Sequence, residues 1–173
     1  VFGSPRLGEV YKRQLSDWAT VHAYAGDEEN TTYMLWLPND TAEETKQFLS
    51  RVTDEWKKAA PDYYEFAIVF EGVQVGAISV ALNDARDTGE LGWVLNKRYW
   101  KRGIAAEAAF AINFFALDVL KRRKLVAHCD SRNTPSDDLM RKLGMTLESD
   151  TGTRTYPKSG ETARELTYSL SVP

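Results

Sequence analysis

The segment 104–120 constrains the fold more than any other part of the sequence. It is apolar on almost every side, with Glu107 and Asp118 on one narrow stripe. A helix of this kind is buried over most of its surface, as when it packs across a sheet. The segment Glu90–Asn96 shortly before it has the pattern of a strand. The pair predicts a strand that leads through a short turn into a helix packed on a sheet.

The remaining periodicities predict an α/β arrangement with a mixed, mostly antiparallel sheet. A capping box at Thr41 and Glu44 begins a helix that we expect to end before Pro61. Gly144 marks the end of a later helix. The expected helices are Trp18–Ala25, Thr41–Ala60, Ile104–Leu120 and Pro135–Leu143. The expected strands are Gly8–Gln14, Tyr64–Glu71, Val75–Leu82 (a hairpin through Gly72), Glu90–Asn96, Leu125–Asp130, Met145–Ser149 and Arg164–Leu170, the last two joined by a long polar connection.

Composition narrows the class of protein. The 173 residues suit one domain, 1–173, and carry 22 Lys and Arg against 25 Asp and Glu. The net charge of −3 argues against a nucleic-acid binder. One cysteine and two histidines argue against a zinc site, so we expect no metal and a cytoplasmic location. The uncharged run Ala108–Leu117 is too short to cross a membrane. The chain does not begin with Met, so Val1–Leu7 is given no structural weight.

The turn between the strand and the buried helix has the chemistry of a phosphate site. Gly103 permits a tight turn, and the first amides of the helix have no partners within the helix. They lie at the positive end of the helix dipole, where anions bind. Lys97, Arg98, Lys101 and Arg102 add four positive charges. The spacing matches neither GxxxxGK[ST] nor GxGxxG. The alternative is a surface turn whose basic residues are simply solvated.

Two strings give the chain a family resemblance. ELGWVLNKRYWKRGIAAEA and LVAHCDSRNTPSDDLMRKLGM resemble the GNAT superfamily of acetyl-CoA-dependent N-acetyltransferases, in the branch that contains ribosomal-protein N-terminal acetyltransferases. The family frame Q/R-x-x-G-x-G/A is filled by WKRGIA, with Trp100 at its first position. The resemblance implies a GNAT fold, whose sheet splays between its fourth and fifth strands and carries helices on both faces.

The resemblance also implies where acetyl-CoA binds. The fourth strand, through Trp93, Val94 and Leu95, would contact the pantetheine and the thioester. Asn133 would bond the pantetheine arm, or else it is a plain helix cap. Ser136 would lie near the departing thiolate. The turn that would bind the pyrophosphate consists of Lys101, Arg102, Gly103, Ile104, Ala105 and Ala106.

The implied reaction is direct attack of an amine on the thioester, and it requires a neutral amine. Deprotonating an α-amine at pH 7 costs about 1–1.4 kcal/mol, against about 4.6 kcal/mol for a lysine-type amine. Glu90 is the candidate base, directly or through water, and the alternative is an exposed strand-end carboxylate. Ser136 is the candidate acid, because Met140 stands where many members carry Tyr.

The acceptor is expected to be the α-amine of a protein or peptide, taken by a monomer or homodimer. The alternatives are a small amine (an amino acid, a polyamine or an aminoglycoside), a non-catalytic acyl-CoA-binding module, and a nucleic-acid module. A peptide acceptor predicts an open groove beside Trp93, and a small amine predicts a closed, acidic pocket.

Several further residues have plainer interpretations. His22 and His128 are expected to be structural, Cys129 inert, and the basic run 121–124 a helix C-terminus. Six aromatic residues could line an acceptor pocket, and at least half of them are expected to be core or rim: Trp18, Tyr33, Trp36, Tyr63, Tyr64 and Trp93.

Overall fold

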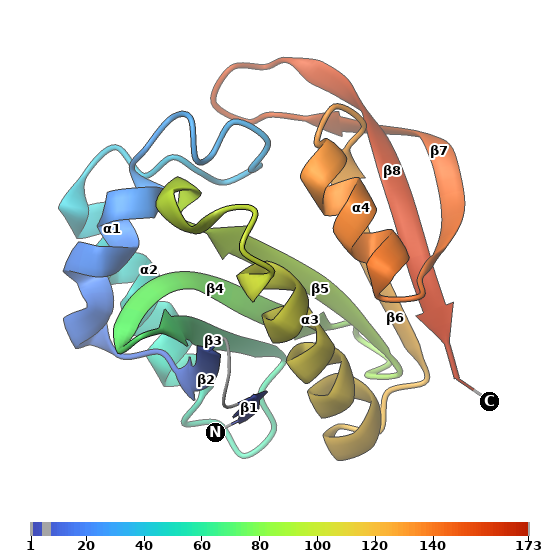
Figure 1. Ribbon diagram of the computed structural model, residues 1–173, viewed down its shortest axis with the longest axis horizontal. Coiled ribbons are helices and arrows are strands. Elements are labelled where there is room, and N and C mark those ends of the chain that lie inside the picture. The colour runs from blue at the N-terminus through green and yellow to red at the C-terminus, as the bar shows by residue number, and fades with distance from the viewer. Residues whose placement is uncertain (1, 5–7, 173) are drawn as a thin grey trace.

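The computed structural model describes residues 2–4 and 8–172, with side chains described from Val10 to Val172. Within them, one sheet has the strand order β1-β2-β3-β4-β5-β6-β8-β7 (Figure 1). All neighbouring strands are antiparallel except β5 and β6. The strands are β1 Phe2–Ser4, β2 Gly8–Lys12, β3 Tyr63–Phe70, β4 Val73–Leu82, β5 Thr88–Leu95, β6 Lys124–Asp130, β7 Thr146–Thr155 and β8 Thr162–Ser171. The helices are α1 Trp18–Ala25, α2 Ala42–Glu55, α3 Ile104–Phe114 and α4 Thr134–Lys142.

Helices cover both faces of the sheet, as the GNAT resemblance implied. On one face, α3 and α4 lie in front of the strands in Figure 1, over a core that includes Ile78, Leu91 and Ile112. On the other face, α1 and α2 bury Tyr24 and Leu49. Because side chains alternate along a strand, each strand contributes every second residue to each layer.

The sheet opens between β5 and β6. Their parallel ladder runs only from the pair Thr88 and Lys124 to the pair Leu91 and Ala127. Both strands continue beyond it, β5 to Leu95 and β6 to Asp130. The predicted splay between the fourth and fifth strands is therefore confirmed. These strands carry the labels β5 and β6 because β1 lies in the part of the sequence that was given no weight. Its side chains lie outside the described residues.

The C-terminal pair differs from the prediction. A long polar connection was expected between Met145–Ser149 and Arg164–Leu170, but β7 and β8 are a long hairpin joined by a short turn. Since β7 is an edge strand with most of its residues exposed, it lacks the apolar alternation that announces a strand. The polar segment 150–155 is therefore part of a strand.

Three smaller features also differ. The long helix predicted over 104–120 is α-helical only to Phe114 and continues as a π-helical segment, Phe115–Val119. The helix predicted to reach Ala60 ends at Glu55. The capping box forms only in part: the Thr41 hydroxyl accepts from the Glu44 amide, but the Glu44 carboxylate accepts from the amide of Asp40 at 2.8 Å.

Candidate acetyl-CoA and acceptor site

The free edge of β5 presents alternate backbone groups to the opening. The Asn96 amide donates to Val75 O at 2.7 Å and the Asn83 amide to Thr88 O at 3.1 Å, so even-numbered residues of β5 bond to β4. In an antiparallel ladder the residues between them turn their N–H and C=O groups the other way. Trp93 and Leu95 therefore turn their backbone groups toward the gap, whereas those of Val94 turn toward β4.

The turn after β5 leads into the first amides of α3. Lys101 and Gly103 have positive φ angles of 60° and 79°. No atom lies within 4 Å of the position that a Cβ on Gly103 would occupy. Ile104 is buried and anchors the start of α3, while the side chain of Ala105 is too small to obstruct the amides. The space beside Gly103 is therefore unobstructed, next to a helix terminus of the kind that binds anions.

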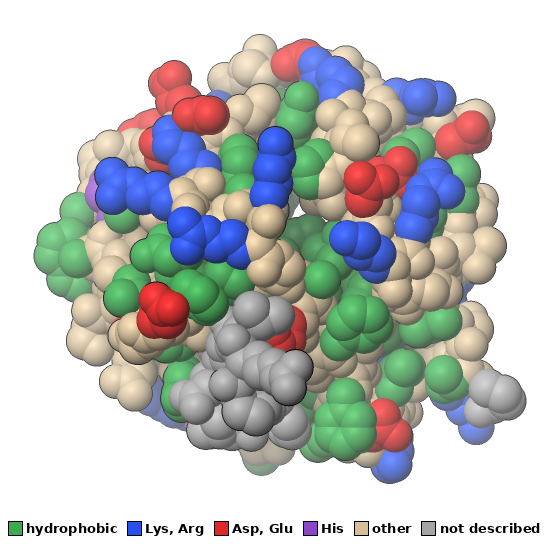
Figure 2. Space-filling view, in the orientation of Figure 1, with side chains coloured by type: hydrophobic (Ala, Val, Ile, Leu, Met, Phe, Trp, Pro, Cys, Tyr) green, Lys and Arg blue, Asp and Glu red, His purple; other side chains and the backbone are tan. Residues whose placement is uncertain are grey.

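Positive charge surrounds this turn. Figure 2 shows Lys and Arg side chains around a hollow whose floor is hydrophobic, on the face that carries α3 and α4. Arg98, Lys101 and Arg102 are exposed, and the Arg102 guanidinium lies 5.4 Å from the centre of the Tyr99 ring. These three side chains can reach phosphate groups bound at the turn.

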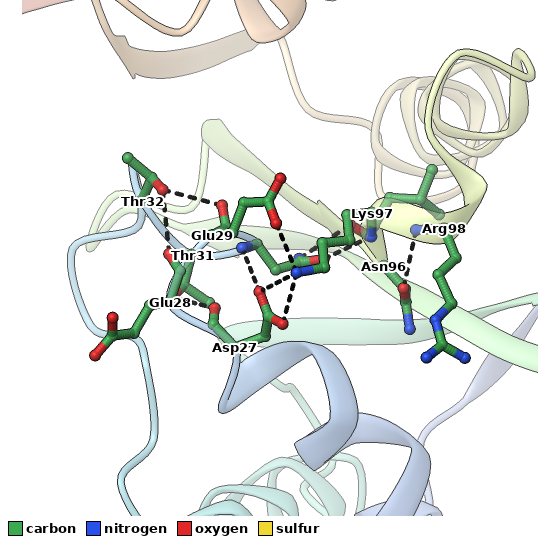
Figure 3. Close-up of polar contacts among 10 residues, drawn as sticks. Asp27, Glu28, Glu29, Thr31, Thr32, Asn96, Lys97 and Arg98 are labelled. Atoms are coloured by element: carbon green, nitrogen blue, oxygen red, sulfur yellow. Dashed lines mark hydrogen bonds and ion pairs between the residues drawn. The ribbon is translucent and has the colours of Figure 1, made fainter.

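Lys97, the fourth predicted cation, is paired with two carboxylates of the protein itself. Lys97 Nζ lies 2.8 Å from Asp27 Oδ2 and 2.7 Å from Glu29 Oε2, and these contacts raise the pKa of Lys97 (Figure 3). In the same loop, the amide group of Asn30 donates to Leu95 O at 3.0 Å and accepts from the Lys97 amide at 2.6 Å. Lys97 therefore fastens the segment after α1 to the end of β5.

The loop 26–40 is also fastened at its other side. Arg154 on β7 donates to Tyr33 O at 3.1 Å, and the Arg132 guanidinium lies 5.6 Å from the centre of the Tyr33 ring. Lys158, in the turn after β7, pairs with Asp40 at 3.0 Å. The loop therefore runs between the end of β5 and the β7–β8 hairpin, on the side of the sheet that carries α1 and α2.

The start of α4 faces the opening from the opposite strand. Asn133 caps the helix by accepting from the Ser136 amide at 3.4 Å. The indole N–H of Trp93 donates to Ser136 Oγ at 3.1 Å, a bond that bridges from β5 to α4. Met140 is fully buried in the core and offers the site no proton. The structure therefore brings Trp93, Asn133 and Ser136 together at the opening.

Glu90 lies on the other face of the sheet. It pairs with Ala81 on β4 and Val126 on β6, within the paired part of the ladder, and it is exposed. Val94, two positions beyond Gly92 on the same face, packs against the cluster under α1 and α2. Glu90 is therefore exposed to solvent near the point where β5 and β6 separate, on the face of the sheet opposite Trp93.

Asp130 is a site residue that the sequence analysis missed. Its buried carboxylate accepts from Arg132 at 2.7 Å and from the Tyr156 hydroxyl at 2.6 Å. Burial by itself would raise the pKa of Asp130, but the hydrogen bonds from Arg132 and Tyr156 hold it well below its usual value. Its backbone O also accepts from the Asn133 amide at 2.9 Å, so it fixes the turn from β6 into α4. The acidic residue that ends the strand and the arginine two residues later were the available signal.

The plainer interpretations of His22, Cys129 and the basic run 121–124 agree with the structure. His22 Nδ1 lies 2.8 Å from Thr45 Oγ1 inside the helical layer. Burial raises the pKa of the Cys129 thiol to about 11, which makes it unreactive. Arg122 donates to Leu120 O at 2.6 Å, at the end of the long helix. Among the aromatic candidates, Tyr64 is in the core, and Trp36 is 78% exposed in the loop 26–40.

Two further expectations concern metals and membranes. Among the described residues, no group of three or more His, Cys, Asp or Glu side chains could hold a metal ion. In the same part of the chain, no helix has the length and apolar character needed to span a membrane.

Comparison with known proteins gives the family. Residues 11–146 match the acetyltransferase (GNAT) domain family. The chain therefore belongs to the GNAT acetyltransferases, and N-acetyl transfer is the activity that this membership supports.

Three similar proteins show how far the likeness extends. The uncharacterized N-acetyltransferase YnaD of Bacillus subtilis is 28% identical over 161 residues, which cover 91% of this chain and 89% of that protein. A GNAT-family acetyltransferase of Bacillus anthracis is 27% identical, with 99% and 98% of the chains covered and a TM-score of 0.84. RimL, a ribosomal alpha-N-protein acetyltransferase solved with coenzyme A, is 17% identical, with coverage of 96% and 95% and a TM-score of 0.82, and shows the shared fold.

Proposed function

We propose that the protein transfers the acetyl group of acetyl-CoA to the α-amine of a protein or peptide, in a ternary complex. The observation that carries this proposal is the opening of the sheet between β5 and β6 beside the uncovered amides at the start of α3. The two features together would suit a long ligand with a phosphate at one end and a thioester at the other. Acetyl-CoA fits that description.

The cofactor would be held on the face that carries α3 and α4. The amides from Lys101 to Ala106, at the positive end of α3, would bind the pyrophosphate. Arg98, Lys101 and Arg102 would add charge-assisted hydrogen bonds to its phosphates. The pantetheine would lie along the backbone edge of Trp93 and Leu95, with Asn133 on its other side. The side chain of Val94 packs toward α1 and α2, so its part in this site would be to hold β5 in place.

The amine would approach from the face that carries α1 and α2. The residues of β5 and β6 that point to that face include Glu90, whose carboxylate is exposed. Glu90 lies in the part of β5 that is still paired with β6, before the strands separate. It would therefore receive the ammonium proton through water. Ser136 lies on the cofactor side, where its hydroxyl accepts from Trp93 and still has its own proton to give to the departing thiolate.

One chemical argument and one observation favour a peptide as the acceptor. An α-amine loses its proton at a cost of about 1–1.4 kcal/mol at pH 7, so it needs less help from a base than a lysine-type amine does. The exposed ring of Trp36 and the half-buried ring of Tyr33 lie in the loop beside the acceptor face, where they could contact residues that follow the amine.

A small amine is the second candidate, because the loop 26–40 is fastened at both of its sides, to β5 and to β7. An acceptor screen that measures free thiol released from acetyl-CoA separates the two. We expect release with a peptide that has a free N-terminus and none with the same peptide blocked there. Release with small amines alone would favour the second candidate, and no release with any amine would contradict the proposal.

A further inference from the structure

His128 lies at the point where β5 and β6 separate. Leu91 and Ala127 are the last pair of their ladder, so Gly92 and His128 are the first residues beyond it. Ala127 and Cys129 point into the core under α3 and α4. Because side chains alternate along a strand, the His128 ring lies on the opposite face, from which the proposed acceptor approaches.

The ring is held by two side chains of β8. His128 Nδ1 lies 2.9 Å from Thr167 Oγ1 and 3.5 Å from Glu165 Oε1. Glu165 is itself fixed, because its other oxygen accepts from Arg154 Nε at 2.9 Å. The Thr167 hydroxyl can donate or accept, and the nearby Glu165 carboxylate electrostatically favours a proton on Nδ1. The lone pair then lies on Nε2, to which no other described side chain is hydrogen-bonded.

The position of the ring suits proton transfer at the thioester. The His128 side chain is 29% exposed, so Nε2 can meet a ligand without a change in the fold. Glu90 lies on the same face, paired with Val126, two residues before His128. An imidazole that is held through one ring nitrogen and has the other unbonded is the arrangement of an oriented general base.

We propose that His128 is a catalytic residue that takes the proton directly from the acceptor ammonium, with Glu90 receiving it afterwards through water. This inference rests on the proposed function. The ammonium gives one proton to Nε2 of His128, and the freed lone pair forms the C–N bond to the acetyl carbon. The C–S bond breaks, and its electron pair leaves with the thiolate. The Ser136 hydroxyl gives its proton to the thiolate and takes up the second proton from the nitrogen, while the first proton passes from His128 through water to Glu90.

The pH dependence of this step also reflects the charges around the ring. These are Glu165 on β8, Arg154 on β7 behind it, Asp130 with Arg132 at the end of β6, and Glu90 on β5. Without the imidazole as base, activity should rise with pH as the acceptor amine loses its proton.

The test uses His128→Gln and His128→Asn, with His22→Gln as the matched control. His22 also holds a Thr hydroxyl through Nδ1, at 2.8 Å, but from α1. We expect kcat of both His128 variants to fall by roughly 10²- to 10⁴-fold at pH 7, with the deficit shrinking toward pH 9, where the α-amine is mostly neutral. Acetyl-CoA affinity by calorimetry should be unchanged, and His22→Gln should match the wild type.

Three results would overturn the inference. Unchanged kcat, a change in KM alone, or a deficit that stays constant with pH would each remove His128 from proton transfer. Thr167→Val tests the same claim with the ring still present: it should lower kcat less than His128→Gln does, and wild-type activity would contradict the orienting role of β8. A wild type that binds acetyl-CoA but acetylates no amine would instead refute the proposed function itself.

Discussion

Gly103→Val places a side chain in the proposed pyrophosphate turn. Gly103 has a φ of 79°, a conformation that costs a residue with a Cβ roughly 1–2 kcal/mol. No atom of the protein lies within 4 Å of the added Cβ, so the substitution meets no steric clash inside the chain. The loss of stability should therefore be limited to that strain, which for a domain of this size corresponds to a lower Tm by about 2–8 °C.

The effect on the cofactor should be much larger than the effect on stability. The new side chain would occupy the space that the phosphates need in order to reach the amides. A hydrogen bond to a charged group contributes about 1.5–3 kcal/mol. Losing two such bonds would weaken acetyl-CoA binding by roughly 10²- to 10⁴-fold.

Gly160→Val is the matched control. Gly160 has a φ of 73° and equally empty surroundings, but it lies in the turn between β7 and β8. Both variants should lose a similar amount of stability in thermal unfolding, and only Gly103→Val should lose acetyl-CoA affinity in calorimetry. A folded Gly103→Val protein that binds acetyl-CoA as the wild type does would refute the placement of the pyrophosphate.

Three further predictions concern the site. Glu90→Gln should lower kcat by about 10²- to 10⁴-fold and leave acetyl-CoA binding nearly unchanged. Its kcat should recover as pH rises, which a pH–rate profile from about pH 6 to 9 would show. Equal rates for the variant and the wild type would remove Glu90 from the mechanism. Ser136→Ala should lower kcat by only about 10²-fold, because a thiolate is already a good leaving group, and an unchanged kcat would leave Ser136 only as the partner of Trp93. Asp130→Asn should destabilise the fold at pH 7 in urea unfolding. The folded-state pKa of Asp130 is depressed, so its contribution is present above the unfolded value near 3.9 and is lost as pH falls toward the folded value. A difference from wild type that did not shrink below about pH 4 would contradict this origin.

The sequence predicted the helices and strands that have one buried, apolar face and one more polar face. The hairpin through Gly72, the strand over 90–96 and the start of α3 all follow from apolar periodicity and from the position of glycines. The prediction failed at β7, because an exposed edge strand has polar residues on both faces. It also placed Lys97 with the phosphate-binding cations, although two carboxylates of a distant loop neutralise it.

The sequence alone could not predict where side chains lie at the point where β5 and β6 separate. The sequence analysis treated His128 and His22 alike, since each is a lone histidine in a regular element. Only the strand register places His128 one residue past the last pair of β5 and β6, beside Thr167. Register depends on pairings between segments about 40 residues apart, and no local spacing reports it.

The most direct test of the account is mass spectrometry of a peptide acceptor after incubation with the protein and acetyl-CoA. The peptide would carry a free N-terminus and an internal lysine, and a second copy would be blocked at the N-terminus. The account predicts one acetyl group, located on the α-amine of the first peptide, and none on the second. Binding of acetyl-CoA without acetylation of either peptide or of any small amine would contradict it.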